Sequence, residues 1–240
     1  RDLAIDLRPV LAIAFPAILT QLATPIGQAY VTRAMADFGE AAVAGMAIVG
    51  RLTPLAFGVI FALSGAVGPI IGQNFGAGQH DRVRGGFSAG VIFVAIFVIC
   101  MTFLLFVLRA PIADIFTATG ITRELVYLFC GPLALVFFFN GLLFVANASF
   151  NNLGHPFYST WLNWGRHTLG TVPFVILGAA WLGAPGVLIG QAIGGVLFGT
   201  LAAIMALRVM RKVEAEATVQ QGDDPFARQA RHMGRSFWKR

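Results

Sequence analysis

Residues 65–84 read GAVGPIIGQNFGAGQHDRVR, an apolar stretch rich in glycine that runs into a short polar connector. Within it, Gly68, Gly72 and Gly76 recur every fourth residue, and this spacing places them on one face of a helix. A face without side chains lets a neighbouring helix approach closely in lipid. Arginines in the connector mark the point where the chain leaves the membrane, and they predict that this point is cytoplasmic. The stretch therefore predicts the end of a membrane-spanning helix inside a bundle.

The composition of the whole chain indicates a membrane protein. Of its 240 residues, 57% are hydrophobic and 12% are charged, whereas a soluble domain carries roughly 25% charged residues. The mean hydropathy is +0.77. Six apolar segments each reach the roughly 20 residues that a spanning helix needs, at about 9–33, 42–75, 86–109, 125–147, 157–181 and 186–208. We therefore expect an all-α fold, a polytopic bundle of six transmembrane helices.

The distribution of basic residues predicts the orientation of the six spans. An even number of spans puts both termini on one side, where the basic residues are Arg8, Arg82, Arg84, Arg208, Arg211 and Lys212. The opposite side holds fewer, namely Arg33, Arg109 and Arg123. This excess predicts cytoplasmic termini, with a six-helix lobe over residues 1–212 and a basic tail over residues 213–240. In the tail we expect an amphipathic helix from Asp224 onward that lies on the anionic inner leaflet.

Polar side chains inside the apolar segments are costly in hydrocarbon, so each is a candidate pathway residue. The candidates are Gln21, Thr24, Gln28, Arg51, Asn140, Asn147 and Asn151. In the first and fourth segments their spacings of three, four and seven residues favour one helix face each, and we expect the two faces to line one cavity. The alternative is that these groups only form hydrogen bonds between helices, worth about 1 kcal/mol each. Arg51 either faces a wet cavity or extends to the outer interface.

Other residues predict how the helices bend, pack and meet the membrane surface. Four prolines are expected to act as hinges in the first two segments, namely Pro16, Pro25, Pro54 and Pro69. In the fifth segment, Arg166 and His167 lie near Trp161 and Trp164, a combination typical of anchors at the membrane interface. A second glycine repeat at four-residue spacing, from Gly186 to Gly194, predicts that the sixth span packs tightly against its neighbours.

Three motifs in order resemble the carboxy-terminal half of MATE (multidrug and toxic compound extrusion) transporters. They are Phe15-Pro16 followed by Gln21 and Pro25, then Gly50-Arg51-Leu52, and then GQNFGAG at residues 72–78, which contains Gly72, Gln73, Asn74, Gly76 and Gly78. The resemblance covers about residues 9–212. It implies one lobe of a twelve-helix secondary active transporter in the bacterial inner membrane, which expels drugs or other cationic or amphiphilic organic compounds in exchange for protons or sodium ions.

Every Asp and Glu falls outside the apolar segments or at their margins, although ion coupling normally needs an ionisable group at membrane depth. The resemblance therefore implies that the site for H⁺ or Na⁺ lies in an amino-terminal six-helix lobe of the same chain, and it implies no other cofactor. Expected partners are small organic substrates, the lipid bilayer and that lobe. The net charge of +6 sits at span ends and in the tail, which indicates anionic lipid and not nucleic acid.

Two other functions compete with efflux. A flippase for lipids or lipid-linked oligosaccharides shares the fold of the superfamily, but such flippases usually line their cavity with several arginines, and only Arg51 and Arg166 are available here. An intramembrane enzyme is less favoured, because the chain has no metal-ligand spacing, paired carboxylates or serine-protease motif.

Overall fold

The computed structural model of the chain describes residues 2–223, and within this range every regular element is a helix. The elements follow in the order α1 (Asp2–Ala36), α2 (Glu40–Gly76), α3 (His80–Ile115), α4 (Gly120–Leu128), the π-helical turn η1 (Phe129–Leu133), α5 (Ala134–Asn152), α6 (Pro156–His167), α7 (Val172–Leu182) and α8 (Ala184–Asp223). The predicted all-α fold is confirmed. α8 crosses the predicted domain boundary at residue 212, and the interfacial helix expected from Asp224 onward lies outside the described residues.

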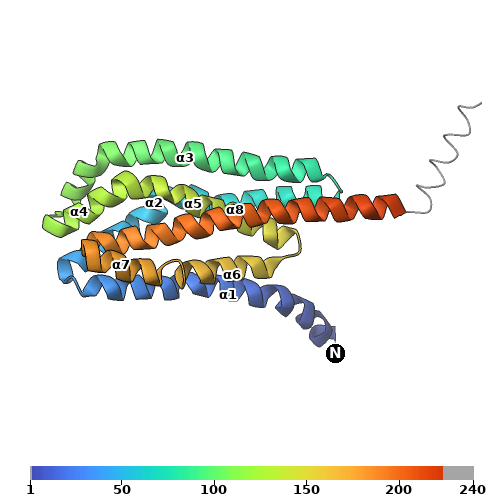
Figure 1. Cartoon of the computed structure of the whole chain (residues 1–240), viewed down its shortest axis with the longest axis horizontal. Coiled ribbons are helices and arrows are strands. Elements are labelled where there is room, and N and C mark those ends of the chain that lie inside the picture. The colour runs from blue at the N-terminus through green and yellow to red at the C-terminus, as the bar shows by residue number, and fades with distance from the viewer. Residues whose placement is uncertain (1, 224–240) are drawn as a thin grey trace, which may run out of the picture.

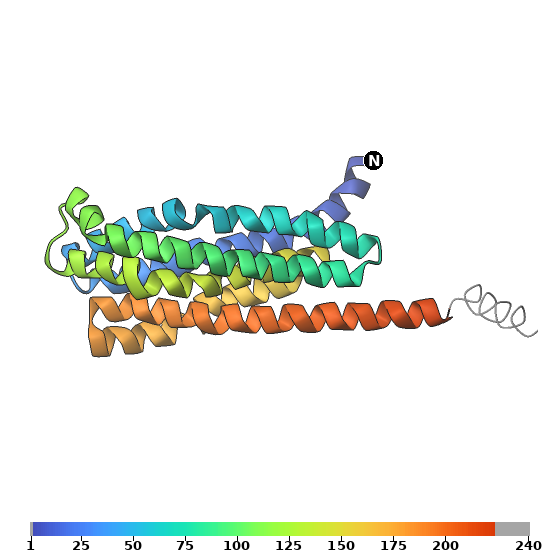
Figure 2. The ribbon, with the colours of Figure 1, turned by 90° about the horizontal axis from the view of Figure 1, so that it is seen from above.

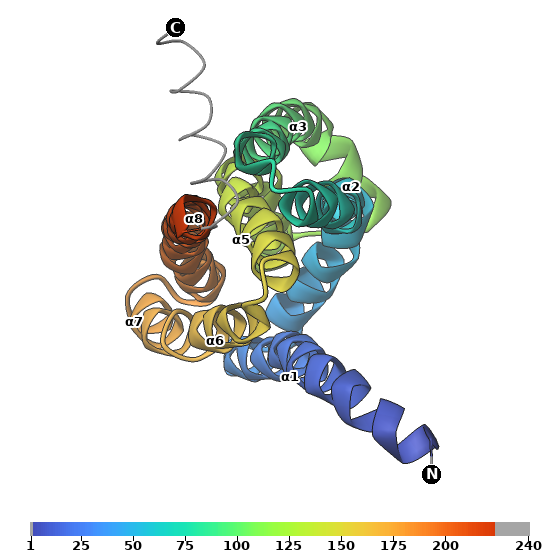
Figure 3. The same cartoon turned by 90° about the vertical axis from the view of Figure 1, so that its right-hand side faces the viewer.

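The helices form an elongated bundle with α5 at its centre. α5 packs against α2, α3, α6 and α8, whereas α1 packs mainly against α6 and α2 (Figure 3). The long helices run along the length of the bundle, and the start of α1 lies at the same end as the end of α8 (Figures 1 and 2). An even number of crossings requires this arrangement of the two ends.

Four of the described helical segments are long and apolar enough to cross a membrane, namely α2, α3, the continuous α4–η1–α5 segment and α8. They match the second, third, fourth and sixth predicted spans, and α1 occupies the first. The fifth span differs from the prediction because α6 and α7, of 12 and 11 residues, are separated by a break at residues 168–171. Each is about 18 Å long or less, well short of the ~30 Å hydrocarbon core. Together they therefore make one interrupted crossing.

The fourth crossing bends within η1. Gly131 has φ −108° and ψ −111°, and the next residue, Pro132, has no N–H to donate to the preceding turn. A π-type turn accommodates this local change in bonding. This bend is not among the predicted hinges. At the four prolines predicted to be hinges, α1 and α2 continue without a break. The adjacent Gly-Pro pair was the available signal for it.

The glycine-rich stretch of residues 65–78 forms the end of α2, as predicted. Gly78 has φ +68°, a left-handed conformation that suits glycine at the end of a helix. The N–H of Gly78 donates to the Phe75 carbonyl at 3.0 Å, and the N–H of Gln79 donates to the Asn74 carbonyl at 2.8 Å. These bonds satisfy carbonyls that the last turn of the helix would otherwise leave free.

The predicted contact face of α2 contains two of its three glycines. A Cβ added at Gly72 would lie 2.7 Å from Oδ1 of Asn152 in α5, and one at Gly68 would lie 3.0 Å from Nδ2 of the same side chain. Gly76 faces open space instead. The close approach to α5 therefore stops one turn before the end of the helix.

α8 approaches its neighbours at its own glycines. Gly186, Gly190 and Gly194 each lie so close to a backbone carbonyl in or just before α7 that an added Cβ would overlap the oxygen. Gly199 has the same relation to the carbonyl of Phe139 in α5. The predicted tight packing of the sixth span is confirmed, and the contacts are between backbones.

Replacing Gly190 by leucine is expected to destabilise the bundle, because the new side chain meets the carbonyl of Phe174. Overpacking typically costs about 1–3 kcal/mol, and a backbone obstacle cannot rotate away. The measurement is thermal unfolding in detergent. Gly58→Leu in α2 is the matched control, since a Cβ there meets nothing within 4 Å. Equal melting temperatures for the two variants would contradict the predicted contact.

Candidate functional site

The break between α6 and α7 has a local cause. Pro173 has no N–H, so the helix cannot continue through it with a complete set of hydrogen bonds. Just before it, the N–H of Gly170 donates to the carbonyl of Gly165 at 2.8 Å, five residues back instead of four. This shift frees the carbonyl of Arg166, which accepts a hydrogen bond from the Thr171 hydroxyl at 2.8 Å. The break therefore gives several of its own backbone groups hydrogen-bond partners, which a hydrocarbon environment favours.

An aromatic ring from α8 fills the notch at the break. A Cβ at Gly170 would come within 2.7 Å of the Phe198 ring, and one at Gly165 would overlap the same ring. Two positions without side chains thus make room for one large side chain. The contact fixes α8 against the interrupted crossing.

Arg166 and His167 end α6 at this break, and Arg166 meets Asn140 of α5. The Arg166 guanidinium donates a hydrogen bond to the side-chain oxygen of Asn140, and its Nη2 lies 2.8 Å from Nε2 of His167. Because a guanidinium only donates, Nε2 accepts, and the neutral imidazole carries its proton on Nδ1. His167 is 5% exposed and lies against Gly27 of α1. We refer to Asn140, Arg166 and His167 as the break cluster.

The break cluster contains a basic group without an acidic counterpart. Among the side chains that the structure describes, no Asp or Glu forms an ion pair with Arg166. Nε of Arg166 and Nδ1 of His167 are buried and have no hydrogen-bond partner among the described residues. Unpaired polar groups at membrane depth are costly and mark functional sites. The cluster therefore offers buried donors to a group rich in acceptors.

The prediction that Arg166 and His167 are interface anchors is wrong. The break places both residues near the middle of the fifth crossing, because α6 ends at His167 and α7 continues the crossing to Leu182. Trp164 also points inward, and its Nε1 donates to the carbonyl of Leu19 in α1 at 2.9 Å. Trp161 is 74% exposed, which fits an anchor.

Two of the three asparagines predicted on α5 contact α6 through their side chains. Oδ1 of Asn151 accepts a hydrogen bond from the Ser159 hydroxyl at 3.1 Å. Asn140 belongs to the break cluster, and Oδ1 of Asn147 is buried with no partner among the described residues. The predicted face of α5 therefore exists, but most of its polar groups meet the interrupted crossing.

The polar face predicted on α1 is not joined to the asparagines of α5. Gln21 and Thr24 are exposed on α1, and Gln28 is half-buried. In cross-section α6 lies between α1 and α5 (Figure 3), and the Thr20 and Thr160 hydroxyls link α1 to α6 at 2.9 Å. The two polar faces thus do not meet within the described lobe.

Arg51 lies on the surface of α2. It is exposed, and Leu55, one turn later, is 83% exposed. Eleven residues separate Arg51 from the start of α2, a rise of about 16 Å. In the part of the chain that the structure describes, Arg51 forms no ion pair. An arginine at this depth on an outward face indicates a surface that is wet or covered by protein.

Sequence reasoning missed the break cluster although a signal was present. The fifth segment carries Gly165, Gly170 and Pro173 around its arginine. A hydrophobic segment interrupted by glycine and proline is a recognised pointer to a binding site in transporters.

Replacing Asn140 by leucine is expected to lower the free energy of unfolding by about 1.5–3 kcal/mol, the range for hydrogen bonds to charged groups. The reason is that the Arg166 guanidinium loses its acceptor. In an Arg166→Met background the same change is expected to cost much less, since the two residues act as a pair. Denaturant unfolding in detergent of the two single variants and the double variant measures this coupling. Gln21→Leu is the matched exposed control. Strictly additive costs would contradict the link.

Comparison with known proteins places the chain in a family. The MatE family profile matches residues 16–177, more than half of the chain. An uncharacterised 21 kDa protein encoded in the iaaL 5′ region of Pseudomonas savastanoi is 32% identical over 241 residues, which cover 95% of this chain and 74% of that protein. A FAD transporter of Shewanella oneidensis is 27% identical over 203 residues, which cover 85% of this chain and 45% of that protein.

Solved structures share the fold. The Vibrio cholerae MATE transporter VcmN in its bent form matches with a TM-score of 0.82 and 24% identity, over 88% of this chain and 48% of that one. The MATE transporter ClbM in complex with Rb⁺ matches with a TM-score of 0.79 and 24% identity, over 88% of this chain and 50% of that one. The chain thus spans about half the length of these transporters. From the family match and the helical membrane bundle together, we conclude that this chain belongs to the MatE family, whose members are membrane transporters and not enzymes.

Proposed function

We propose that this chain is one lobe of a secondary active exporter that exchanges small amphiphilic organic compounds, including lipophilic cations, for protons or sodium ions. The observation that carries the proposal is the break cluster at the middle of an interrupted crossing. Transporters commonly build substrate and ion sites near the bilayer midplane from interrupted helices, whose freed polar groups face a cavity. Asn140, Arg166 and His167 supply such groups here.

A second lobe is needed to complete the cavity in this proposal. Gln21, Thr24 and Arg51 are exposed on α1 and α2, and bare polar groups facing lipid are unfavourable. The chain also spans about half of the transporters of known structure that it matches. An amino-terminal six-helix lobe would cover these residues and supply the carboxylate that carries the coupling ion.

The proposed location is the bacterial inner membrane, with the shared end of α1 and α8 on the cytoplasmic side. Basic residues of the first turns of α3 and of the second half of α8 lie toward this end, where Arg84 pairs with Glu214; they are Arg82, Arg84, Arg208, Arg211 and Lys212. The positive-inside rule assigns such an end to the cytoplasm.

A second substrate class is favoured by one feature of the cluster. Arg166 has no acidic partner among the described side chains, and arginine is well suited to phosphate and carboxylate groups. The FAD transporter that matches this chain is named for a substrate with a pyrophosphate. The second candidate is therefore export of an organic anion. Only two arginines, Arg51 and Arg166, lie within the crossings as possible lining residues, which favours a small solute over a lipid-linked oligosaccharide.

Transport by vesicles that hold this chain joined to an amino-terminal MATE lobe tests the main proposal. With a proton or sodium gradient imposed, ethidium is expected to move in the joined protein but not in vesicles of the 240-residue chain alone. Gln28→Leu is expected to slow this movement several-fold, because it removes an amide from the part of the proposed cavity that α1 lines. Gln79→Leu in the α2–α3 connection is the matched control and should leave the rate unchanged. Gradient-driven uptake by the chain alone would refute the half-transporter proposal.

The charge of Arg166 separates the two substrate classes. If the substrate is an anion, Arg166→Gln is expected to lower FAD transport by about tenfold or more, equivalent to the loss of roughly 1.4 kcal/mol of binding, while Arg166→Lys retains part of it. If the substrate is a cation, neither substitution is expected to reduce ethidium transport, because binding of a cation does not need the positive charge of Arg166. The measurement compares the two compounds in the same vesicles, with melting temperature as the check on folding.

A further inference from the structure

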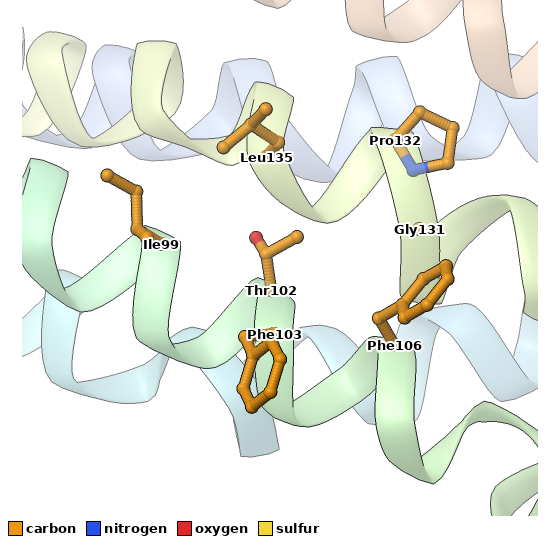
Figure 4. A pocket seen from close by; sticks show the side chains of 7 residues that line it. All are labelled: Ile99, Thr102, Phe103, Phe106, Gly131, Pro132 and Leu135. Carbon is orange, nitrogen blue, oxygen red and sulfur yellow. The ribbon is translucent and has the colours of Figure 1, made fainter.

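A groove opens on the outer side of the bundle where α4 and α5 bend against α3. It has a volume of about 430 Å³ and is lined by Ile99, Thr102, Phe103, Phe106, Gly131, Pro132 and Leu135 (Figure 4). The groove results from the bend in η1, since Gly131 has no side chain to fill it and departs from helical geometry. The fold thus leaves a hollow between two crossings that otherwise pack closely.

The lining of this groove is apolar and faces away from the protein core. Phe103 is 71% exposed, Ile99 60% and Leu135 51%. The one hydroxyl among the lining residues, that of Thr102, is buried and has no hydrogen-bond partner among the described residues. In a chain that crosses the membrane, these side chains meet lipid. The groove therefore fits a hydrocarbon chain rather than a polar solute.

A cation stands at one end of the groove. The guanidinium carbon of Arg109 lies 4.1 Å from the centre of the Phe106 ring, which lines the groove, and 5.2 Å from the centre of the Tyr127 ring. The neighbouring Arg123 pairs with Asp114 at 3.2 Å. Arg109 has no acidic partner among the described side chains. It is therefore available to an anion outside the protein.

The distance between the cation and the far end of the groove matches one lipid leaflet. Ile99 and Arg109 lie ten residues apart on α3, a rise of about 15 Å. This is half of the ~30 Å hydrocarbon thickness. Arg109 also ends the apolar part of α3, where basic residues meet the headgroups. A phospholipid whose phosphate binds Arg109 would thus place its acyl chain beside Ile99.

We propose that this groove is a binding site for an anionic phospholipid. One acyl chain lies between α3 and the bend of η1, and the phosphate binds Arg109. The partner combines the two properties that the site requires, a hydrocarbon chain of one leaflet's length and a negative headgroup. The bound chain fills the hollow that the bend leaves beside Gly131, so the lipid supports the bent form of the fourth crossing.

Native mass spectrometry of the full chain tests the headgroup. After release from mixed micelles with phosphatidylglycerol or phosphatidylcholine, the wild type is expected to retain phosphatidylglycerol preferentially. Arg109→Gln is expected to reduce this preference about fivefold, in line with the contribution of one basic residue near an anionic surface. Arg82→Gln, an exposed arginine at the opposite end of the bundle, is the control and should retain the wild-type preference. Equal retention of the two lipids by the wild type overturns the proposal, and so does an unchanged preference in Arg109→Gln.

A groove-filling pair of variants tests the acyl chain independently of charge. Ile99→Trp places a large ring in the groove, whereas Ile92→Trp adds the same ring to an equally lipid-facing position two turns away, since Ile92 is 58% exposed. Phosphatidylglycerol retention is expected to fall several-fold in Ile99→Trp and to stay at the wild-type level in Ile92→Trp. Both positions face outward, so both variants should fold, and equal melting temperatures confirm it. Equal lipid retention by the two variants overturns the groove as the site.

Discussion

A backbone carbonyl inside hydrocarbon needs a hydrogen-bond partner, and this constraint decides how the fifth crossing is allowed to break. The chain meets part of this need with its own side chains: the Thr171 hydroxyl donates to the carbonyl of Arg166, and the Thr168 hydroxyl donates to the carbonyl of Trp164 at 2.7 Å. These local hydrogen bonds lower the cost of ending α6 within the fifth crossing. Arg166 lies in the last turn of α6, and this end of the helix brings its guanidinium beside Asn140.

The rest of the bundle uses two kinds of interface, and both follow from the lack of a hydrophobic drive between helices in lipid. On one side of α5, aromatic rings join it to α2, with Phe57 stacked on Phe137 at 4.1 Å and Phe61 edge-on to Phe144 at 5.2 Å. On the other side, α8 meets α5 and α7 through glycines with its backbone in direct contact. The first interface gains dispersion from large surfaces, and the second gains it from close approach.

The sequence predicted the class of fold and the places where helices touch, because these depend on composition and on four-residue spacing. The glycine repeat of α8 is the clearest case, since spacing alone placed Gly190 at a contact. The same reasoning failed at residues 166–171. There the side chains of Arg166 and His167 were read from their distance to tryptophans, whereas the outcome depends on which carbonyl each donor selects. Glycine and proline in the fifth segment signalled an interruption, but its hydrogen bonds and packing depend on Thr171 and on Phe198 of another helix. For the same reason the sequence did not predict that Asn140 binds Arg166 on another helix.

α8 is a single helix of 40 residues, about 60 Å long, and it is anchored at two distant points. Near its middle the ring of Phe198 sits in the notch of the fifth crossing, and near its end Glu214 forms an ion pair with Arg84 at the start of α3. An unbroken helix is stiff along its axis, so α8 links these two points rigidly. A displacement at the start of α3 would therefore shift α8 relative to the centre of the lobe, and a displacement at the break would shift the outer end of α8.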